Sequence, residues 1–187
     1  MCVLQLFNEV DRIHRSQKGF SDRFRGGFAS VLTNVLQLAK GKSPIAKQYN
    51  EARQDALAED LPGIDFRAGL ILLPVILKEK VEHFITMGEG DPATPYPTIR
   101  LLDNDWKMAI EGRALNVVKV DGVDVCQCTG IEDGFITAFS MHFVFNIAYP
   151  LHLKNTLTFL QRHIVSIVEE GEKPLPVTVL RVINLLC

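Results

Sequence analysis

The stretch GFITAFSMHFVFNIAYPLHL, residues 134–153, contains no Asp, Glu, Lys or Arg and lies between the charged residues Asp133 and Lys154. An uncharged run of about 20 residues is long enough to cross a bilayer. Its content favours a different interpretation, because Pro150 would end the helix expected from Ile131 to Tyr149 and small polar side chains occur along that helix. These polar residues are Thr137, Ser140, His142 and Asn146.

The apolar residues of this run indicate a helix buried on several sides. At helical spacing, one wide face carries Ile136, Phe139, Phe143 and Ile147, and another carries Met141 and Phe145. A helix that is apolar nearly all round is typical of a protein core. The run also lacks the basic flanking segments that orient membrane spans. The sequence therefore predicts a core helix and no membrane partner.

Length and composition describe an ordinary globular protein. With 187 residues, 47% of them hydrophobic, the chain is expected to form one domain or one domain with a helical extension. A net charge of −2 gives no general attraction to nucleic acid or anionic membranes. Residues 1–9 lack the features of a signal peptide, and four cysteines make a poor disulfide framework. We expect a cytoplasmic or nuclear protein.

Residues 1–60 are predicted to be a helical N-terminal segment. The first apolar stripe at helical spacing consists of Val3, Leu6, Phe7, Val10 and Ile13. The second consists of Phe20, Phe24, Phe28, Val31, Leu32, Val35 and Leu36. Gly41 is expected to close the second helix, and Ser43 followed by Pro44 to begin a third. That third helix is predicted to end at Leu61-Pro62-Gly63.

Residues 61–187 are predicted to form an α+β domain, either separate from the N-terminal segment or continuous with it. Gly69 to Leu77 is an apolar run interrupted by Pro74, which indicates a buried, kinked helix. The stretch 88–97 contains three prolines and two glycines. It is predicted to be a loop and is the expected internal boundary.

Strands are predicted at Thr98–Leu102 and Lys107–Val120 from alternation and β-branched residues. Asp121-Gly122, between two runs rich in valine, is the strongest hairpin signal in the chain.

Two further segments complete the predicted fold. Leu151 to Glu170 carries an amphipathic stripe and is predicted to be a helix, while Leu175–Leu185 is interpreted as a final strand. The two helices joined through Tyr149-Pro150 are expected to pack as a hairpin against the sheet. The predicted fold class is α+β, with N-terminal helices followed by a small antiparallel sheet packed by a C-terminal helical hairpin.

Several short patterns resemble the C-terminal region of a group of uncharacterised animal proteins, some of which carry a sterile alpha motif domain upstream. These patterns are Leu72-Leu73-Pro74, the loop with Pro92, Pro95 and Pro97, Phe143-x-x-x-Asn146-x-x-Tyr149-Pro150 and Thr156-x-x-Phe159-Leu160-Gln161. The resemblance covers residues 65–170, and within the 187 residues we find no pattern of a sterile alpha motif domain. It implies a module that usually forms the tail of a longer chain, and it supplies no activity.

No pattern in the sequence predicts a catalytic residue, a metal site or a cofactor. Cys126-x-Cys128 does not have the usual spacing of a zinc half-site, and on a strand both thiols would face the same way and pack as small hydrophobes. Gly41-Lys42-Ser43 ends like a phosphate-binding loop, but Leu36 stands where that motif requires glycine.

The histidines are likewise interpreted as structural. His152 and His163 are too far apart along one helix to share a metal and are expected to flank the core. His142 and Asn146 on the uncharged helix must find hydrogen-bond partners if they are buried. A Cys126–His142 nucleophile pair stays open, because the sequence does not show which residues meet in space.

Basic residues outnumber acidic ones between residues 11 and 47. Amphipathic helices with solvated basic faces explain this asymmetry, and a phosphate-contacting patch is the alternative. The candidate nucleic-acid-binding residues are Arg12, Arg15, Lys18, Arg23 and Arg25, followed along the chain by Lys40, Lys42 and Lys47.

The sequence best fits a protein–protein interaction module that associates with itself or with a protein partner. The surplus of apolar surface supports this interpretation. The hypothetical interface is the N-terminal stripe Val3, Leu6, Phe7, Val10 and Ile13, and no catalytic activity is inferred. The alternatives are a nucleic-acid-binding adaptor that uses the basic segment 11–47, and a small hydrolase with Cys/His geometry.

Overall fold

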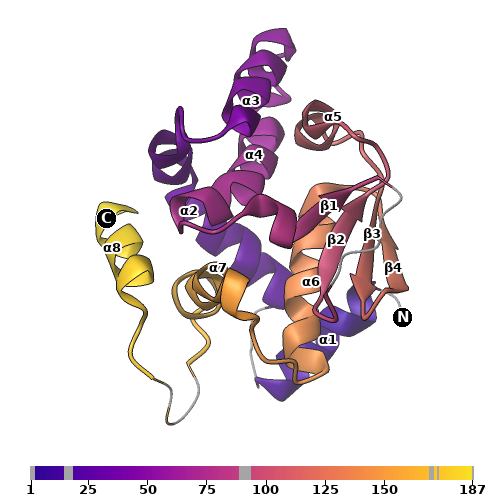
Figure 1. Cartoon of the computed structure of the whole chain (residues 1–187), viewed down its shortest axis with the longest axis vertical. Coiled ribbons are helices and arrows are strands. Elements are labelled where there is room, and N and C mark those ends of the chain that lie inside the picture. Colours follow the sequence, from indigo (N-terminus) through magenta and orange to yellow (C-terminus); the bar gives the residue numbers. More distant parts are fainter. Residues whose placement is uncertain (1–2, 15–18, 89–93, 169–170, 172, 187) are drawn as a thin grey trace.

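The computed structural model describes residues 3–14, 19–88, 94–168, 171 and 173–186 (Figure 1). The fold is α+β, as predicted, with helices at both ends of the chain and a four-stranded sheet between them. The N-terminal helices are α1 (Val3–Ile13), α2 (Phe20–Ala39), α3 (Pro44–Asp55) and α4 (Leu61–Ile76). The strands are β1 (Ile85–Met87), β2 (Thr98–Leu101), β3 (Asn116–Val120) and β4 (Val123–Cys128). The remaining helices are α5 (Trp106–Glu111), α6 (Ile131–Val144), α7 (Lys154–Phe159) and α8 (Val177–Leu186).

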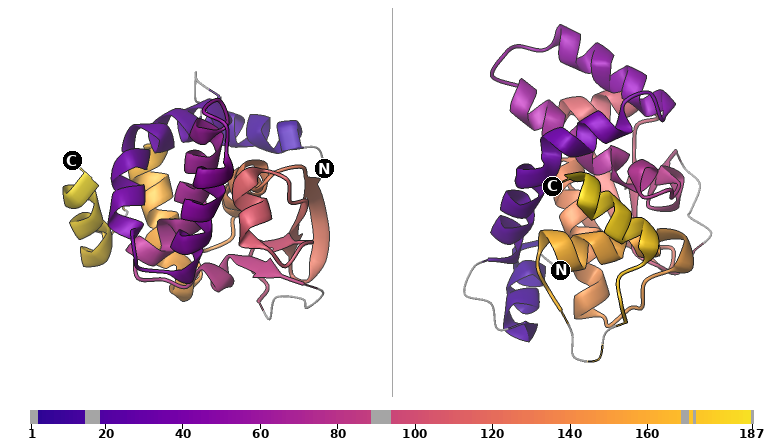
Figure 2. Two further views of the ribbon diagram at one scale, coloured as in Figure 1. Left: turned by 90° about the horizontal axis from the view of Figure 1, so that it is seen from above. Right: turned by 90° about the vertical axis from the view of Figure 1, so that its left-hand side faces the viewer.

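Helix α6 is the centre of the molecule, which confirms that the first part of the uncharged run, residues 134–142, belongs to the core. It packs against strands β2, β3 and β4 on one side and against α1 and α4 on another (Figures 1 and 2). From Gly134 to His142 every residue is buried. Phe24 of α2 contacts both Phe135 and Phe139 of α6 with ring centroids about 6 Å apart. No helix in the described part of the chain is long and apolar enough to span a bilayer.

Helix α6 ends earlier than predicted because of the backbone conformation of Asn146. The helix stops at Val144 and does not continue to Tyr149. Asn146 takes a left-handed conformation with φ 51°, and the amide of Ile147 then donates to the carbonyl of His142 at 2.9 Å. Such a hydrogen bond after a left-handed residue is a Schellman ending, which asparagine tolerates well. Asn146 is therefore exposed, outside the helix, and not buried within it.

The sheet has the strand order β1-β2-β3-β4 and is mixed, not purely antiparallel. Strand β1, which the sequence analysis missed, pairs in parallel with β2, and the other pairs are antiparallel. The predicted hairpin is confirmed, because Asp121 and Gly122 both have positive φ, at 51° and 74°. Two such residues form the type I′ turn that matches the twist of the flanking strands.

The prediction of one strand over Lys107–Val120 is wrong in its first half. Residues Trp106–Glu111 form α5, because the Asp105 side chain accepts a hydrogen bond from the Lys107 amide at 2.8 Å and caps the helix. Gly112, with φ 80°, ends this helix. Strand β3 begins only at Asn116.

The C-terminal predictions also need correction. The segment predicted as one helix over Leu151–Glu170 forms a 3₁₀ turn, Leu151–Leu153, then α7 and a π-helical turn, Leu160–Ile164. Residues 165–168 are not helical, and residues 169 and 170 lie outside the described part. Residues predicted as a final strand form α8 instead, because Val179, Val182 and Leu186 are buried at helical spacing. Helix α7 packs against α4 and α8.

The N-terminal helices agree with the prediction more closely. The Ser43 side chain accepts a hydrogen bond from the Ile45 amide at 3.2 Å and caps α3, which begins with Pro44. Leu61-Pro62-Gly63 begins α4, however, and does not end α3. One hydrophobic cluster extends through the described residues from Leu6 to Leu186.

Candidate functional site

Helix α8 carries three of the exposed large apolar side chains in the described part of the chain, Val177, Leu180 and Leu185. Val179, Val182 and Leu186 are buried, and the helix packs against α7 and α2. Its end is fixed because Asn34 of α2 donates its side-chain amide to the carbonyl of Leu186 at 2.8 Å. Figure 1 shows α8 at the edge of the molecule.

The opposite side of α8 faces solvent and is also largely apolar. Val177 is 82% exposed, Leu180 47% and Leu185 55%. At helical spacing Arg181 and Asn184 lie among these residues on the same side, and both are exposed. A surface helix normally presents a polar face to water. Helix α8 instead presents a face on which Val177, Leu180 and Leu185 surround Arg181 and Asn184.

The N-terminal stripe, which was the predicted interface, is buried within the chain. Helix α1 packs against α6 and α2, where Leu6, Phe7 and Val10 are buried. The Phe7 ring lies 6.3 Å from that of Phe20. Only Ile13 of the stripe is substantially exposed, and the side chain of Val3 lies outside the described part. Association through this stripe would require α1 to leave its own core.

The predicted nucleic-acid-binding arginines contact acidic groups of the same chain. Arg25 donates to Glu132 at 2.5 Å and to Asp133 at 2.7 Å. Arg12 pairs with Glu9, also at 2.5 Å. Arg15 and Lys18 lie outside the described residues.

Arg23 also contacts groups of its own chain. It donates to the carbonyl of Val165 at 3.1 Å and lies 3.7 Å from Asp11. Cations that are neutralised within the chain attract phosphate weakly. Arg23 and Arg25 therefore link α2 to neighbouring parts of the fold, whereas the ion pair of Arg12 lies within α1.

The cysteines and His142, considered for a hydrolase, occupy different surroundings. Cys128 is buried with its sulfur 4.0 Å from the Thr137 hydroxyl, and burial raises the pKa of this thiol to about 12. A thiol with that pKa is not a nucleophile near neutrality. Cys126 on the edge strand β4 is half-buried. The described residues that line the cavity around His142 include no cysteine.

The other histidines show one pair that the sequence did not reveal. The rings of His83 and His152 meet edge to face with centroids 4.6 Å apart. Burial, and next the neighbouring His83, lower the pKa of His152. His163 packs against Phe159. Within the described ranges no three His, Cys, Asp or Glu side chains gather closely enough to hold a metal ion.

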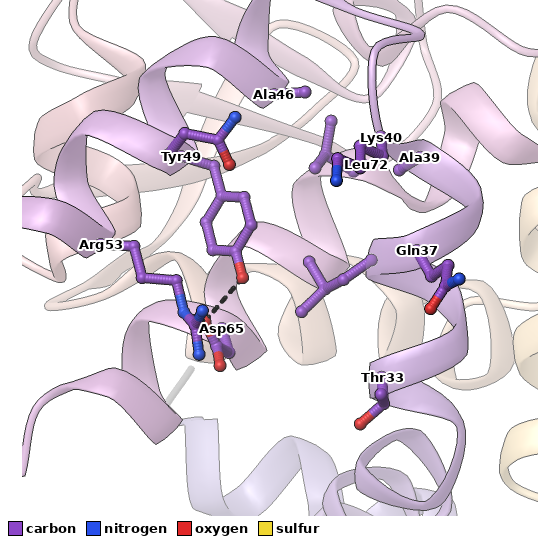
Figure 3. A pocket seen from close by; sticks show the side chains of 11 residues that line it. Thr33, Gln37, Ala39, Lys40, Ala46, Tyr49, Arg53, Asp65 and Leu72 are labelled. Atoms are coloured by element: carbon purple, nitrogen blue, oxygen red, sulfur yellow. Dashed lines mark hydrogen bonds and ion pairs between the residues drawn. The ribbon is translucent and has the colours of Figure 1, made fainter. Parts of the chain in front are cut away.

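A cavity of about 350 Å³, lined by both polar and apolar side chains, lies between α2, α3 and α4. Figure 3 shows its lining. The Tyr49 hydroxyl donates to Asp65 Oδ1 at 2.7 Å, and Arg53 Nε donates to the same oxygen at 3.0 Å. Burial, and next the hydrogen bond to Asp65, raise the pKa of the Tyr49 phenol. The phenol is therefore protonated and the carboxylate is paired. This arrangement joins α3 to α4.

Comparisons with known protein families, with curated proteins and with solved structures found no match. The resemblance to the tail region of uncharacterised animal proteins stays a prediction.

Proposed function

We propose that this chain is a protein-association module and that the exposed face of α8 is its contact surface. The observation that supports the proposal is the exposure of Val177, Leu180 and Leu185 on a helix that is held firmly by its other side. Apolar side chains that gather on one exposed face commonly mark an interaction site.

The occupant that we propose is a second copy of the chain, arranged about a two-fold axis. Two-fold dimers are the commonest assemblies of identical chains, and they need a surface that matches itself. An antiparallel pairing of two α8 helices centred between Val182 and Ile183 sets Arg181 at the same height as Asn184 of the other copy. Each guanidinium can then donate to the amide oxygen of Asn184 in the other copy, which offsets part of the repulsion between the two Arg181 side chains, about 4.5 Å apart along the axis at the usual helical rise.

The size of the surface sets the expected affinity. A stable dimer buries about 800 Å² on each partner, whereas one short helix offers less. Burying the exposed parts of a few Val and Leu side chains contributes about 1 kcal/mol each. We therefore expect weak, reversible dimerisation, with a dissociation constant in the micromolar to millimolar range.

Sedimentation velocity over a wide concentration series tests this proposal. The average mass is expected to rise from that of a monomer towards that of a dimer as the concentration increases. A monomer mass that stays constant over the whole series would show that the chain does not associate with itself.

A further inference from the structure

A second cavity, of about 680 Å³, lies where the ends of α1 and α6 meet the π-helical turn after α7. Its lining includes His14 from the end of α1, His142 and Phe143 from α6, Tyr149 from the following turn and Gln161 from the π-helical turn. The volume falls within the range of small-molecule sites. This cavity is therefore large enough to hold a ligand.

His142 is a polar side chain of this lining with a ring nitrogen that has no hydrogen-bond partner among the described residues. It is only 4% exposed. Its Nδ1 lies 3.0 Å from the carbonyl oxygen of Ile147. A carbonyl can only accept, so Nδ1 carries the ring hydrogen and Nε2 carries the lone pair. Within the described part of the chain, the buried Nε2 has no hydrogen-bond partner.

An unpaired buried acceptor is costly and uncommon in folded proteins. It can be satisfied by a group that donates a hydrogen bond. Burial lowers the pKa of His142 to about 4, so the ring is neutral at neutral pH and Nε2 stays an acceptor. An anionic ligand would find no donor at this position.

Aromatic rings form much of the remaining lining of this cavity. The Tyr149 ring meets the His142 ring edge to face at 5.1 Å, and His14 meets Phe143 in the same way at 5.1 Å. Flat apolar groups pack well beside such rings. Tyr149 is half-buried, and access of a ligand to the buried Nε2 of His142 requires that this or another lining side chain move aside.

We propose that this cavity binds a neutral aromatic ring that carries one N–H or O–H group and donates it to Nε2 of His142. A free aromatic compound and a tryptophan side chain of another polypeptide share this chemistry. The inference does not depend on the association through α8 proposed above.

A pair of ligands that differ in a single hydrogen tests the proposal on the unmodified protein. Indole has the N–H donor and N-methylindole does not, while both have the same aromatic body. Titration followed by NMR is expected to show indole binding about tenfold more tightly than N-methylindole, the difference that one satisfied hydrogen bond makes. The ¹⁵N shift of Nε2 in His142 should move with indole and stay unchanged with N-methylindole. Equal affinity for both compounds, or no binding of indole at millimolar concentration, would overturn the proposal.

A variant and a matched control assign the effect to His142. In His142→Phe, which keeps a ring but removes the acceptor, indole should lose its advantage over N-methylindole. His163→Phe makes the same change at a half-buried histidine that is not among the cavity's lining residues, and the tenfold preference should persist. A preference that survives in folded His142→Phe would also contradict the proposal. If His142→Phe does not fold, the two ligands and the Nε2 shift still decide the question.

A peptide of the sequence Gly-Trp-Gly distinguishes the two sources of the ligand. A peptide that binds at least as tightly as indole supports a protein partner, whereas a clear preference for indole supports a free aromatic compound. Binding of the peptide must also move the Nε2 shift of His142. A peptide that binds without moving it would speak against recognition through this nitrogen.

Discussion

Gly134 on α6 lies directly against the side-chain amide of Asn116 on β3, so close that any Cβ at residue 134 would overlap Asn116 Oδ1. Asn116 is fully buried, so it cannot move aside into solvent. This contact sets how closely the central helix approaches the sheet.

Replacing Gly134 by alanine is therefore expected to destabilise the protein by about 1–3 kcal/mol, the usual cost of overpacking a core. Gly26→Ala is the matched control, because Gly26 is also within a helix but has open space around its Cα. That substitution should stabilise the protein by about 0.5–1 kcal/mol through helix propensity. Urea denaturation measures both changes. Equal effects at the two positions would show that α6 does not approach the sheet this closely.

The second prediction concerns the aromatic core. Phe139 is completely buried among the rings of α2 and α6, whereas Phe145 at the end of α6 is 44% exposed. Phe139→Ala should cost about 3–5 kcal/mol, and Phe145→Ala should change stability much less. Thermal or urea unfolding of the two variants checks the order. A cost for Phe145 as large as that for Phe139 would mean that α6 is rotated from the orientation described.

The third prediction concerns pH. Burial lowers the pKa of His142 from 6.5 to about 4, so the unfolded chain binds this proton more readily than the folded one. The contribution of neutral His142 to the free energy of unfolding is fully present above pH 6.5 and is lost as the pH falls from 6.5 towards about 4. A shift of this size corresponds to about 3 kcal/mol.

The free energy of unfolding is measured at neutral pH and near pH 4, in the wild type and in His142→Phe. Other groups titrate in the same window, including His152 and His163, whose pKa values are also lowered by burial. The informative quantity is therefore the difference between the wild type and His142→Phe, which should lose clearly less stability on acidification. Identical pH dependence in the two proteins would show that His142 is not buried in its neutral form.

The fourth prediction concerns Arg25, which was interpreted from the sequence as a candidate phosphate contact. Because it joins α2 to Glu132 and Asp133 of α6, Arg25→Ala should lower stability by about 1–2 kcal/mol at low salt and less at high salt. Lys42→Ala at an exposed turn is the control and should have little effect. A variant that loses oligonucleotide affinity without losing stability would favour the nucleic-acid alternative instead.

The parts of the fold that were predicted correctly are those whose signals are local. Asp121-Gly122 requires positive φ at both residues, and Ser43-Pro44 combines a cap with a residue suited to the first helical turn. The uncharged run identifies the central helix because burial on all sides excludes charge.

The errors arise where tertiary packing or one capping residue decides the structure. Residues 107–120 alternate like a strand, but the cap at Asp105 and the left-handed Gly112 enclose a short helix within them. The β-branched residues of α8 favour a strand, but burial of Val179, Val182 and Leu186 against the helices makes them helical. Parallel pairing of β1 with β2 leaves no local signal at all.

The candidate site was missed for a related reason. The sequence indicates a surplus of apolar residues, but it does not show which helix faces the core. The N-terminal stripe is covered by α6, whereas Leu180 and Leu185 on the outer side of α8 are not. Likewise, the meeting of Tyr149 with His142 depends on the left-handed turn at Asn146.

The most direct test of association through α8 is sedimentation velocity of the wild type, of Leu180→Glu combined with Leu185→Glu, and of Leu57→Glu. Leu57 is 66% exposed outside α8, in the turn between α3 and α4, so it controls for the introduction of a charge at an exposed leucine. The wild type and Leu57→Glu should both increase in average mass with concentration, and the double variant should stay monomeric while circular dichroism shows it folded. A wild type that is monomeric throughout, or a double variant that associates as the wild type does, would contradict association through α8.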